Sequence, residues 1–141
     1  MNVMQVEVVS NEYNIYSGEA SFVVVPTVQG ELGIYPRHEP IMSLVRPGAL
    51  RLQIPGEKEE VLVAVSGGVL EVQPDKLTVL ADVAVRSSEM DQARAEEAKK
   101  AAEAGIAKAT DDEALAKAHS ALAAALAELK TLDYIRSRKH Q

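Results

Sequence analysis

The first half of the chain repeats apolar residues with the period of two that is typical of β-strands. In the segment Met4–Val8 every second residue is apolar, and Gln5 and Glu7 stand between them, which predicts a strand with one buried face. No helical pattern of useful length interrupts this half, so the crossovers of a parallel sheet are missing. An antiparallel β-sandwich or flattened barrel is therefore expected. Further strands are predicted at 20–25, 50–54, 61–65, 68–73 and 77–81.

After Arg86 the composition changes from that of strands to that of helices. All seventeen valines precede Arg86, whereas sixteen of the twenty-one alanines follow it. Valine fits a pleated sheet and alanine has the highest helix propensity, so the change marks a domain boundary. We therefore predict a β-sandwich domain over residues 1–86 and an α-helical domain over residues 87–141, an α+β fold with the two classes in sequence order.

The helical domain is predicted to be an antiparallel hairpin of two helices. Ser88 is the expected N-cap of the first helix, which should end near Gly105. A capping box that begins at Thr110 predicts a second helix to about Arg136. The short connection between them favours an antiparallel arrangement.

The two predicted helices differ in the size of their apolar residues. The first carries a stripe of small residues with one isoleucine: Ala95, Ala98, Ala102 and Ile106. The second carries a leucine series close to a heptad seam: Leu115, Leu122, Leu126, Leu129 and Leu132. A leucine packed against alanines buries less apolar surface than it would against a larger partner. The hairpin is therefore expected to be weakly held and to alternate between two packing arrangements. A permanently folded hairpin is the alternative.

Composition and motifs argue against several classes of function. The chain has no cysteine, and its net charge of −6 does not favour nucleic acid or an anionic lipid surface. It contains no phosphate-binding or HExxH motif, and no run of eighteen apolar residues. His38, His119 and His140 lack the spacing of metal ligands, so neither a metal site nor a catalytic site is expected.

The segment Gly30–Pro40, followed by Arg46–Gly48, combines three glycines, which admit positive φ, with three prolines, which lock φ at about −65°. A loop of fixed path can present side chains to a partner, although a rigid turn without a partner has the same composition. This segment and the block Ser66–Pro74 resemble the epsilon subunit of the F-type ATP synthase in order and spacing. Without these motifs, the chain would be a generic sandwich adaptor with a helical tail.

The resemblance implies a non-catalytic subunit of the enzyme's central stalk, at the cytoplasmic face of the inner membrane. In that family the sandwich binds the gamma subunit and the membrane rotor ring (the c-ring), and only the complex ties it to the membrane. The loop residues expected at this junction are Gly30, Glu31, Leu32, Gly33, Tyr35, Pro36, His38 and Pro40.

The resemblance also implies a regulatory role for the hairpin. When extended, the C-terminal helix of the family enters the catalytic head of alpha and beta subunits and blocks ATP hydrolysis. The basic end of the chain suits an acidic segment of the beta subunit. The residues expected to act in the inhibitory helix are Leu115, Leu122, Leu126, Leu129, Arg136 and Arg138.

An ATP-sensing hairpin is the alternative function. Some epsilon subunits bind ATP through a segment Ile/Leu-Asp-x-x-Arg-Ala, which Asp91, Arg94 and Ala95 match here. In those relatives the second helix adds arginines, whereas this chain has alanines and Glu128 in the stretch 123–128. Asp91 and Arg94 would otherwise form a surface pair at i,i+3. Apart from ATP in this alternative, no cofactor is expected.

Overall fold

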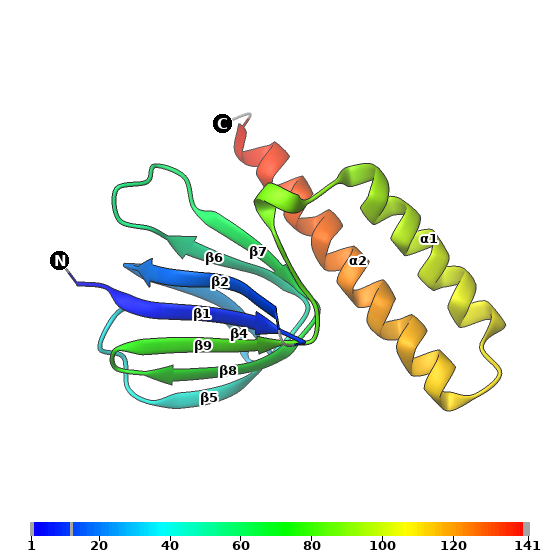
Figure 1. The fold of residues 1–141 in the computed structure, drawn as a ribbon, viewed down its shortest axis with the longest axis horizontal. Coiled ribbons are helices and arrows are strands. Elements are labelled where there is room, and N and C mark those ends of the chain that lie inside the picture. The colour runs from blue at the N-terminus through cyan, green and yellow to red at the C-terminus, as the bar shows by residue number, and fades with distance from the viewer. Residues whose placement is uncertain (1, 12, 140–141) are drawn as a thin grey trace.

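The computed structural model describes residues 2–11 and 13–139 and comprises a β-sheet domain followed by two α-helices (Figure 1). His140, considered above as a metal ligand, lies outside the described residues. The strands are β1 (Met4–Ser10), β2 (Tyr13–Ala20), β3 (Phe22–Thr27), β4 (Gly30–Ile34), β5 (Ile41–Val45), β6 (Gly48–Gln53), β7 (Val61–Val65), β8 (Gly68–Gln73), β9 (Lys76–Ala81) and β10 (Ala84–Arg86). A 3₁₀ turn (Ser87–Glu89) leads to α1 (Gln92–Lys108) and α2 (Asp112–Lys139).

The strands form one sheet that folds over on itself as a sandwich, in the order β10-β7-β6-β3-β5-β8-β9-β1-β2, with β4 beside β3. The predicted β-sandwich followed by helices is thus confirmed. The pairing is not antiparallel throughout, because β1 runs parallel to β9. No crossover helix is needed, since the rest of the sandwich connects these two strands.

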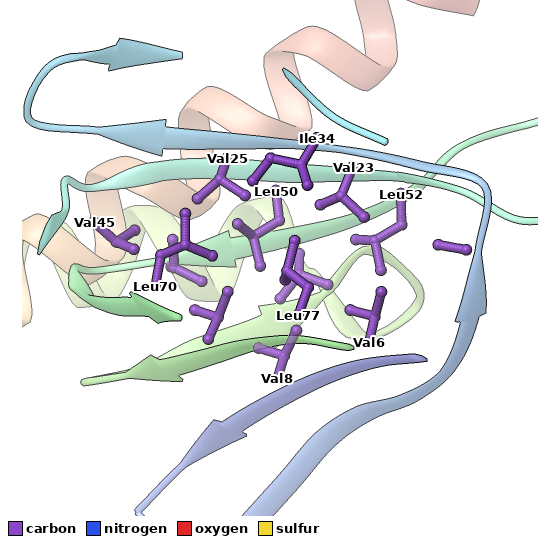
Figure 2. Close-up of a cluster of buried hydrophobic side chains, with 14 of the residues drawn as sticks. Val6, Val8, Val23, Val25, Ile34, Val45, Leu50, Leu52, Leu70 and Leu77 are labelled. Atoms are coloured by element: carbon purple, nitrogen blue, oxygen red, sulfur yellow. The ribbon is translucent and has the colours of Figure 1, made fainter. Parts of the chain in front are cut away.

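The core lies between the two layers of the sheet and consists mainly of valine and leucine (Figure 2). The alternation predicted for Met4–Val8 is confirmed, because Met4, Val6 and Val8 are at most 2% exposed. Ile34 of β4 and Leu50 of β6 are fully buried in the same cluster. Each such side chain contributes roughly 1.5–3 kcal/mol when fully buried, so this cluster holds the sandwich together.

Several of the predicted strands match the structure, whereas other strands of the structure were not predicted. The predictions for 61–65 and 68–73 coincide with β7 and β8. The segment Gly30–Pro40 was expected to be a loop, but its first five residues form β4, paired antiparallel with β3. Strands β2, β5 and β10 were not predicted. These are short or have largely exposed residues, so their pairing partners decide their conformation.

The two helices begin and end at other residues than predicted. Asp91, rather than Ser88, caps α1, because its Oδ1 accepts a hydrogen bond from the Arg94 backbone N–H at 3.1 Å. Asp111, one residue after Thr110, caps α2 through the Ala114 N–H at 2.7 Å. Helix α1 continues through Gly105 to Lys108. A Cβ at Gly105 would lie 3.3 Å from Ala118 Cβ, so the glycine allows the helices to approach closely.

Helix α2 packs against both the sandwich and α1 (Figure 1). It contacts β6 and β7 near its C-terminal end and runs antiparallel to α1 along its length. No helix in the described part of the chain is both long and apolar enough to cross a membrane.

Candidate functional site

The predicted docking segment consists of strand β4, which forms a β-hairpin with β3, and the loop that follows it. Gly30 has a φ of +112°, and the Thr27 hydroxyl donates a 2.6 Å hydrogen bond to its carbonyl oxygen, which closes the β3–β4 turn. Gly33 lacks such a φ, but a Cβ there would lie 2.8 Å from Phe22 Cζ. Glycine therefore serves two needs in this segment, a positive φ at Gly30 and close packing at Gly33.

The structure places the side chains of this segment at different ends of β4. Glu31 lies near the start of the strand and pairs with Arg51 of β6 at 3.5 Å. Tyr35 is 65% exposed and its ring lies 4.4 Å from that of Phe22. His38 lies beyond the end of the strand, where its Nδ1 is 2.8 Å from the Glu39 carbonyl oxygen. Glu31 and His38 thus do not form one compact site.

The loop after β4 is fixed by its backbone. Arg37 has a φ of +68°, unusual for a residue with a side chain, and its N–H donates to the Pro74 carbonyl oxygen at 2.6 Å. Leu32 packs against the core, Pro36 is half-buried, and Pro40 is exposed. A loop so held can present a constant surface to a partner, although the docking role of these residues stays a prediction.

The seam predicted on α2 holds only in part, because Ala125 is buried but none of its five leucines is. Leu115 is 36% and Leu126 is 44% exposed, whereas Leu122, Leu129 and Leu132 are half-buried. The fully buried positions of α2 carry the small or polar residues Ala125, Ala127, Glu128 and Thr131. Because α2 contacts two bodies, the sandwich and α1, its buried surface follows both contacts rather than a single heptad seam.

On α1 the predicted small-residue stripe holds only in part. Ala95 and Ala102 are buried, but Ala98 is exposed and Ile106 is half-buried. The α1–α2 contact is therefore made of small side chains, which leaves few methylene groups to stabilise the folded hairpin.

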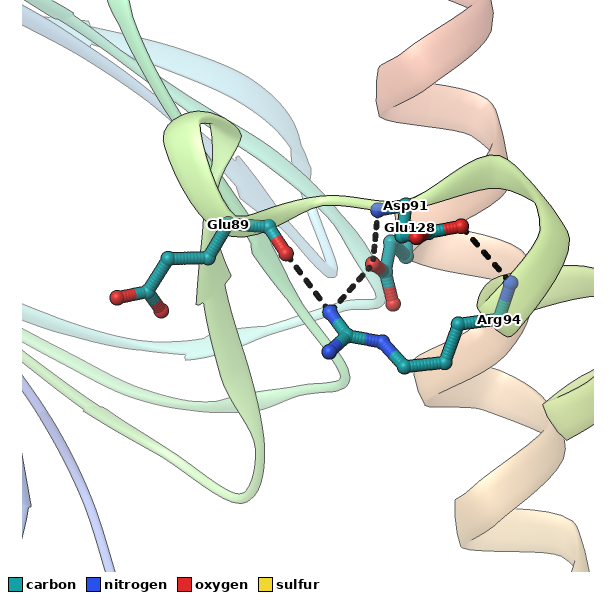
Figure 3. Close-up of polar contacts among 4 residues, drawn as sticks. All are labelled: Glu89, Asp91, Arg94 and Glu128. Carbon is teal, nitrogen blue, oxygen red and sulfur yellow. Dashed lines mark hydrogen bonds and ion pairs between the residues drawn. The ribbon is translucent and has the colours of Figure 1, made fainter.

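Asp91 and Arg94, the residues of the ATP alternative, are engaged within the hairpin (Figure 3). The Arg94 guanidinium donates to the Glu89 carbonyl oxygen at 2.7 Å and lies 3.8 Å from Glu128 Oε1. Glu128 Oε1 also accepts from the Asp91 N–H at 3.4 Å. The surface pair expected between the Asp91 and Arg94 side chains is replaced by the helix cap and by an ion pair with the nearly buried Glu128.

The basic end of α2 is divided between two neighbours. Arg136 donates to the Gln92 side chain of α1 at 3.0 Å. Arg138 faces the sandwich, with ion pairs to Glu59 at 3.7 Å and Glu60 at 3.9 Å. In the folded hairpin both predicted inhibitory arginines therefore contact this chain itself.

Two family models together cover most of the chain. The beta-sandwich domain of the ATP synthase Delta/Epsilon chain matches residues 3–87, and the long alpha-helix domain of the same chain matches residues 88–133. The chain belongs to the ATP synthase delta/epsilon chain family. The resemblance found in the sequence is thus confirmed.

Relatives of this family match along nearly their full length. The ATP synthase epsilon chain of Neisseria meningitidis serogroup C / serotype 2a (strain FAM18) is 86% identical over 99% of both chains. That of Chromobacterium violaceum is 61% identical over 99% of this chain and 100% of its own. A chain from the Euglena gracilis mitochondrial ATP synthase shares the fold, with a TM-score of 0.72 at 20% identity over 94% of this chain and 82% of its own.

The structure also reveals an apolar surface that the sequence analysis did not identify. Leu44 of β5 lies opposite Val69 of β8, which lies opposite Leu80 of β9. Leu44 is 59% and Leu80 is 54% exposed, and Met42, two residues before Leu44, is 72% exposed. We call Met42, Leu44, Val69 and Leu80 the outer apolar row. Exposed apolar residues that gather in this way are typical of protein interfaces.

A signal for the outer apolar row was present in the sequence. A strand with one solvated face alternates apolar and polar residues, as in Met4–Val8. In the segment Val79–Ala81 three apolar residues follow one another, and Met42 and Leu44 occupy the positions of β5 that face outward. Apolar residues on both faces of a strand indicate that the outer face is covered by something else.

Proposed function

We propose that the chain is the non-catalytic regulatory and coupling subunit in the central stalk of an F-type ATP synthase. Its sandwich docks on the gamma subunit and on the membrane rotor ring, and its C-terminal helices inhibit ATP hydrolysis when they extend towards the alpha and beta subunits. It acts at the cytoplasmic face of the membrane, to which it is bound through the complex. Membership of the epsilon-chain family supports this role.

The observation that carries the docking proposal is the outer apolar row. It crosses three neighbouring strands of a sheet whose opposite face is already buried in the core. Burying exposed leucines against a partner stabilises a complex by about 25 cal/mol per Å² of apolar surface, before the cost of association. We assign the outer apolar row to the gamma subunit, and the segment from Glu31 to Pro40 to the junction with the rotor ring.

The Leu44→Asp and Leu80→Asp double variant tests this assignment in a pull-down with the gamma subunit. We expect gamma binding to fall at least tenfold, because two carboxylates would be desolvated at the interface, at a cost of several kcal/mol each. The melting temperature should change little, since both positions are already more than half exposed.

Leu126→Asp is the matched control, because it makes the same replacement at a 44% exposed position outside the sandwich. It should bind gamma as the parent chain does. Parent-like binding by the double variant would show that gamma contacts another surface, and equal losses in both variants would indicate a non-specific effect of added charge.

A further inference from the structure

The C-terminal end of α2 is attached to the sandwich by a series of polar contacts. The Tyr134 hydroxyl accepts a hydrogen bond from Arg51 Nη1 at 3.3 Å and donates one to Glu60 Oε1 at 3.2 Å. Arg51 belongs to β6, and Glu60 directly precedes β7. The Arg51 guanidinium also lies 5.7 Å from the centre of the Tyr134 ring, within the range of a cation–π contact. Tyr134 therefore joins two parts of the sandwich.

Arg138 extends this attachment by one helical turn. It lies four residues after Tyr134, so the two side chains project from the same face of α2. Its Nη2 pairs with Glu59 at 3.7 Å, and its Nη1 lies 3.9 Å from the same Glu60 oxygen that accepts from Tyr134. Nη1 is buried without a hydrogen-bond partner, so this pair is loosely made.

This series of polar contacts ends at Glu31. Arg51 uses Nη1 for Tyr134 and Nη2 for Glu31, at 3.5 Å. One guanidinium thus connects the helix to a residue of β4 that is expected to face the rotor ring. The hydrogen bond to Tyr134 is also the main reason why the pKa of Arg51 is raised.

Apolar packing also contributes to this contact, because Leu62 and Ala64 of β7 are buried without belonging to the core cluster, and α2 contacts β7. The buried residues of this part of α2 are themselves small or polar, namely Ala127, Glu128 and Thr131. A cleft of about 170 Å³ lies between α2 and the sandwich, and Glu31, Arg51 and Tyr134 are among its lining residues. Partly exposed polar pairs each change an equilibrium by a factor of at most about five, so the attachment can be released.

We propose that Glu31, Arg51, Tyr134, Glu60 and Arg138 form a latch that holds the end of α2 on the sandwich. The latch ties the state of the hairpin to the edge of the sandwich at Glu31. A partner that engages Glu31 withdraws one of the two groups that orient Arg51, and so favours release of α2. This last step rests on the proposed function, whereas the latch itself belongs to the isolated chain.

Hydrogen–deuterium exchange of the full-length isolated chain tests the latch, because exchange detects rare opening of α2. In Tyr134→Phe and in Arg138→Gln we expect the exchange rate of amides 127–136 to rise about two- to fivefold. A smaller rise is expected for Glu31→Gln, which acts through Arg51. Raising the salt concentration from about 0.05 to about 1 M should speed exchange in the parent, and less so in Arg138→Gln.

Lys117→Gln is the matched control, since it removes the same charge from an exposed position of the same helix that does not line the cleft at the sandwich. It should exchange as the parent does. Unchanged exchange in both Tyr134→Phe and Arg138→Gln would overturn the latch, as would an equal rise in Lys117→Gln. No effect of Glu31→Gln would overturn the link to β4. Because no complex is needed, a failure of the proposed inhibition would leave these results standing.

Discussion

Gly68, at the first position of β8, brings two backbones closer than any side chain would tolerate. Its φ is +148°, and a Cβ there would lie 2.1 Å from the Leu80 carbonyl oxygen of β9. We expect Gly68→Ala to lower the free energy of unfolding by about 3 kcal/mol or more, because backbone atoms must move. Urea unfolding followed by circular dichroism measures this loss.

Gly56→Ala is the control for this substitution. Gly56 also has a positive φ, +85°, but a Cβ there would have no atom within 4 Å. Only the cost of the left-handed conformation remains, about 1–2 kcal/mol. Equal losses in the two variants would show that φ, rather than the approach of β9, makes Gly68 necessary.

For single residues, the sequence indicates where a residue type is needed, but it does not always indicate the physical reason. The glycines of the segment Gly30–Gly48 were expected to supply positive φ, and only Gly30 does so. At Gly33 and Gly48 a glycine is needed for space, because an added Cβ would lie 2.8 Å from Phe22 and 3.1 Å from Pro26, respectively. Both partners are distant along the chain, so single-sequence analysis could not identify them.

Among elements, the strands with one buried face were predictable and the others were not. In β1 and β9 the buried residues alternate with more exposed ones, and the pattern alone identifies them. Strand β2 has mostly exposed residues and β4 contains two glycines, so pairing with β1 and β3 determines their conformation. The seam on α2 holds only in part for a similar reason, since a heptad pattern presupposes a single partner helix.

The contacts between helices α1 and α2 also bear on whether the chain binds ATP. Arg94 already contacts Glu128 and the Glu89 carbonyl oxygen, and the facing stretch of α2 is rich in alanine. We therefore expect millimolar ATP to leave the melting temperature of the isolated chain unchanged within about 1 °C, whereas ATP at 100 times its Kd would add roughly 2.7 kcal/mol of stability.

Arg94→Gln separates the outcomes of this thermal-shift titration. If ATP raises the melting temperature of the parent and Arg94→Gln abolishes the rise, the hairpin is an ATP sensor and Arg94 is a ligand-binding residue. A rise that persists in Arg94→Gln would indicate an ATP site elsewhere in the chain. The ion pair with Glu128 would then not be the reason for weak binding at this position.

For the whole molecule, the contacts of α2 bear on the two states proposed for the hairpin. The sandwich has a large core of its own, whereas α2 is held by small residues along α1 and by the latch on β6 and β7. We therefore expect a free energy of opening of a few kcal/mol, the range that a rotor position or a ligand can shift. The exposed Leu115 and Leu126 would gain contacts in a larger partner groove.

Inhibition by the extended hairpin is therefore expected in the assembled complex. Deletion of all residues after Ser88 should raise the rate of ATP hydrolysis, because the inhibitory helix is lost. A disulfide between Gly105→Cys and Ala118→Cys should do the same, since a Cβ at Gly105 lies 3.3 Å from Ala118 Cβ, close to disulfide geometry. The chain has no other cysteine, so reduction should restore the parent rate. If neither variant hydrolyses ATP faster than the parent complex, the hairpin has a structural role and does not inhibit.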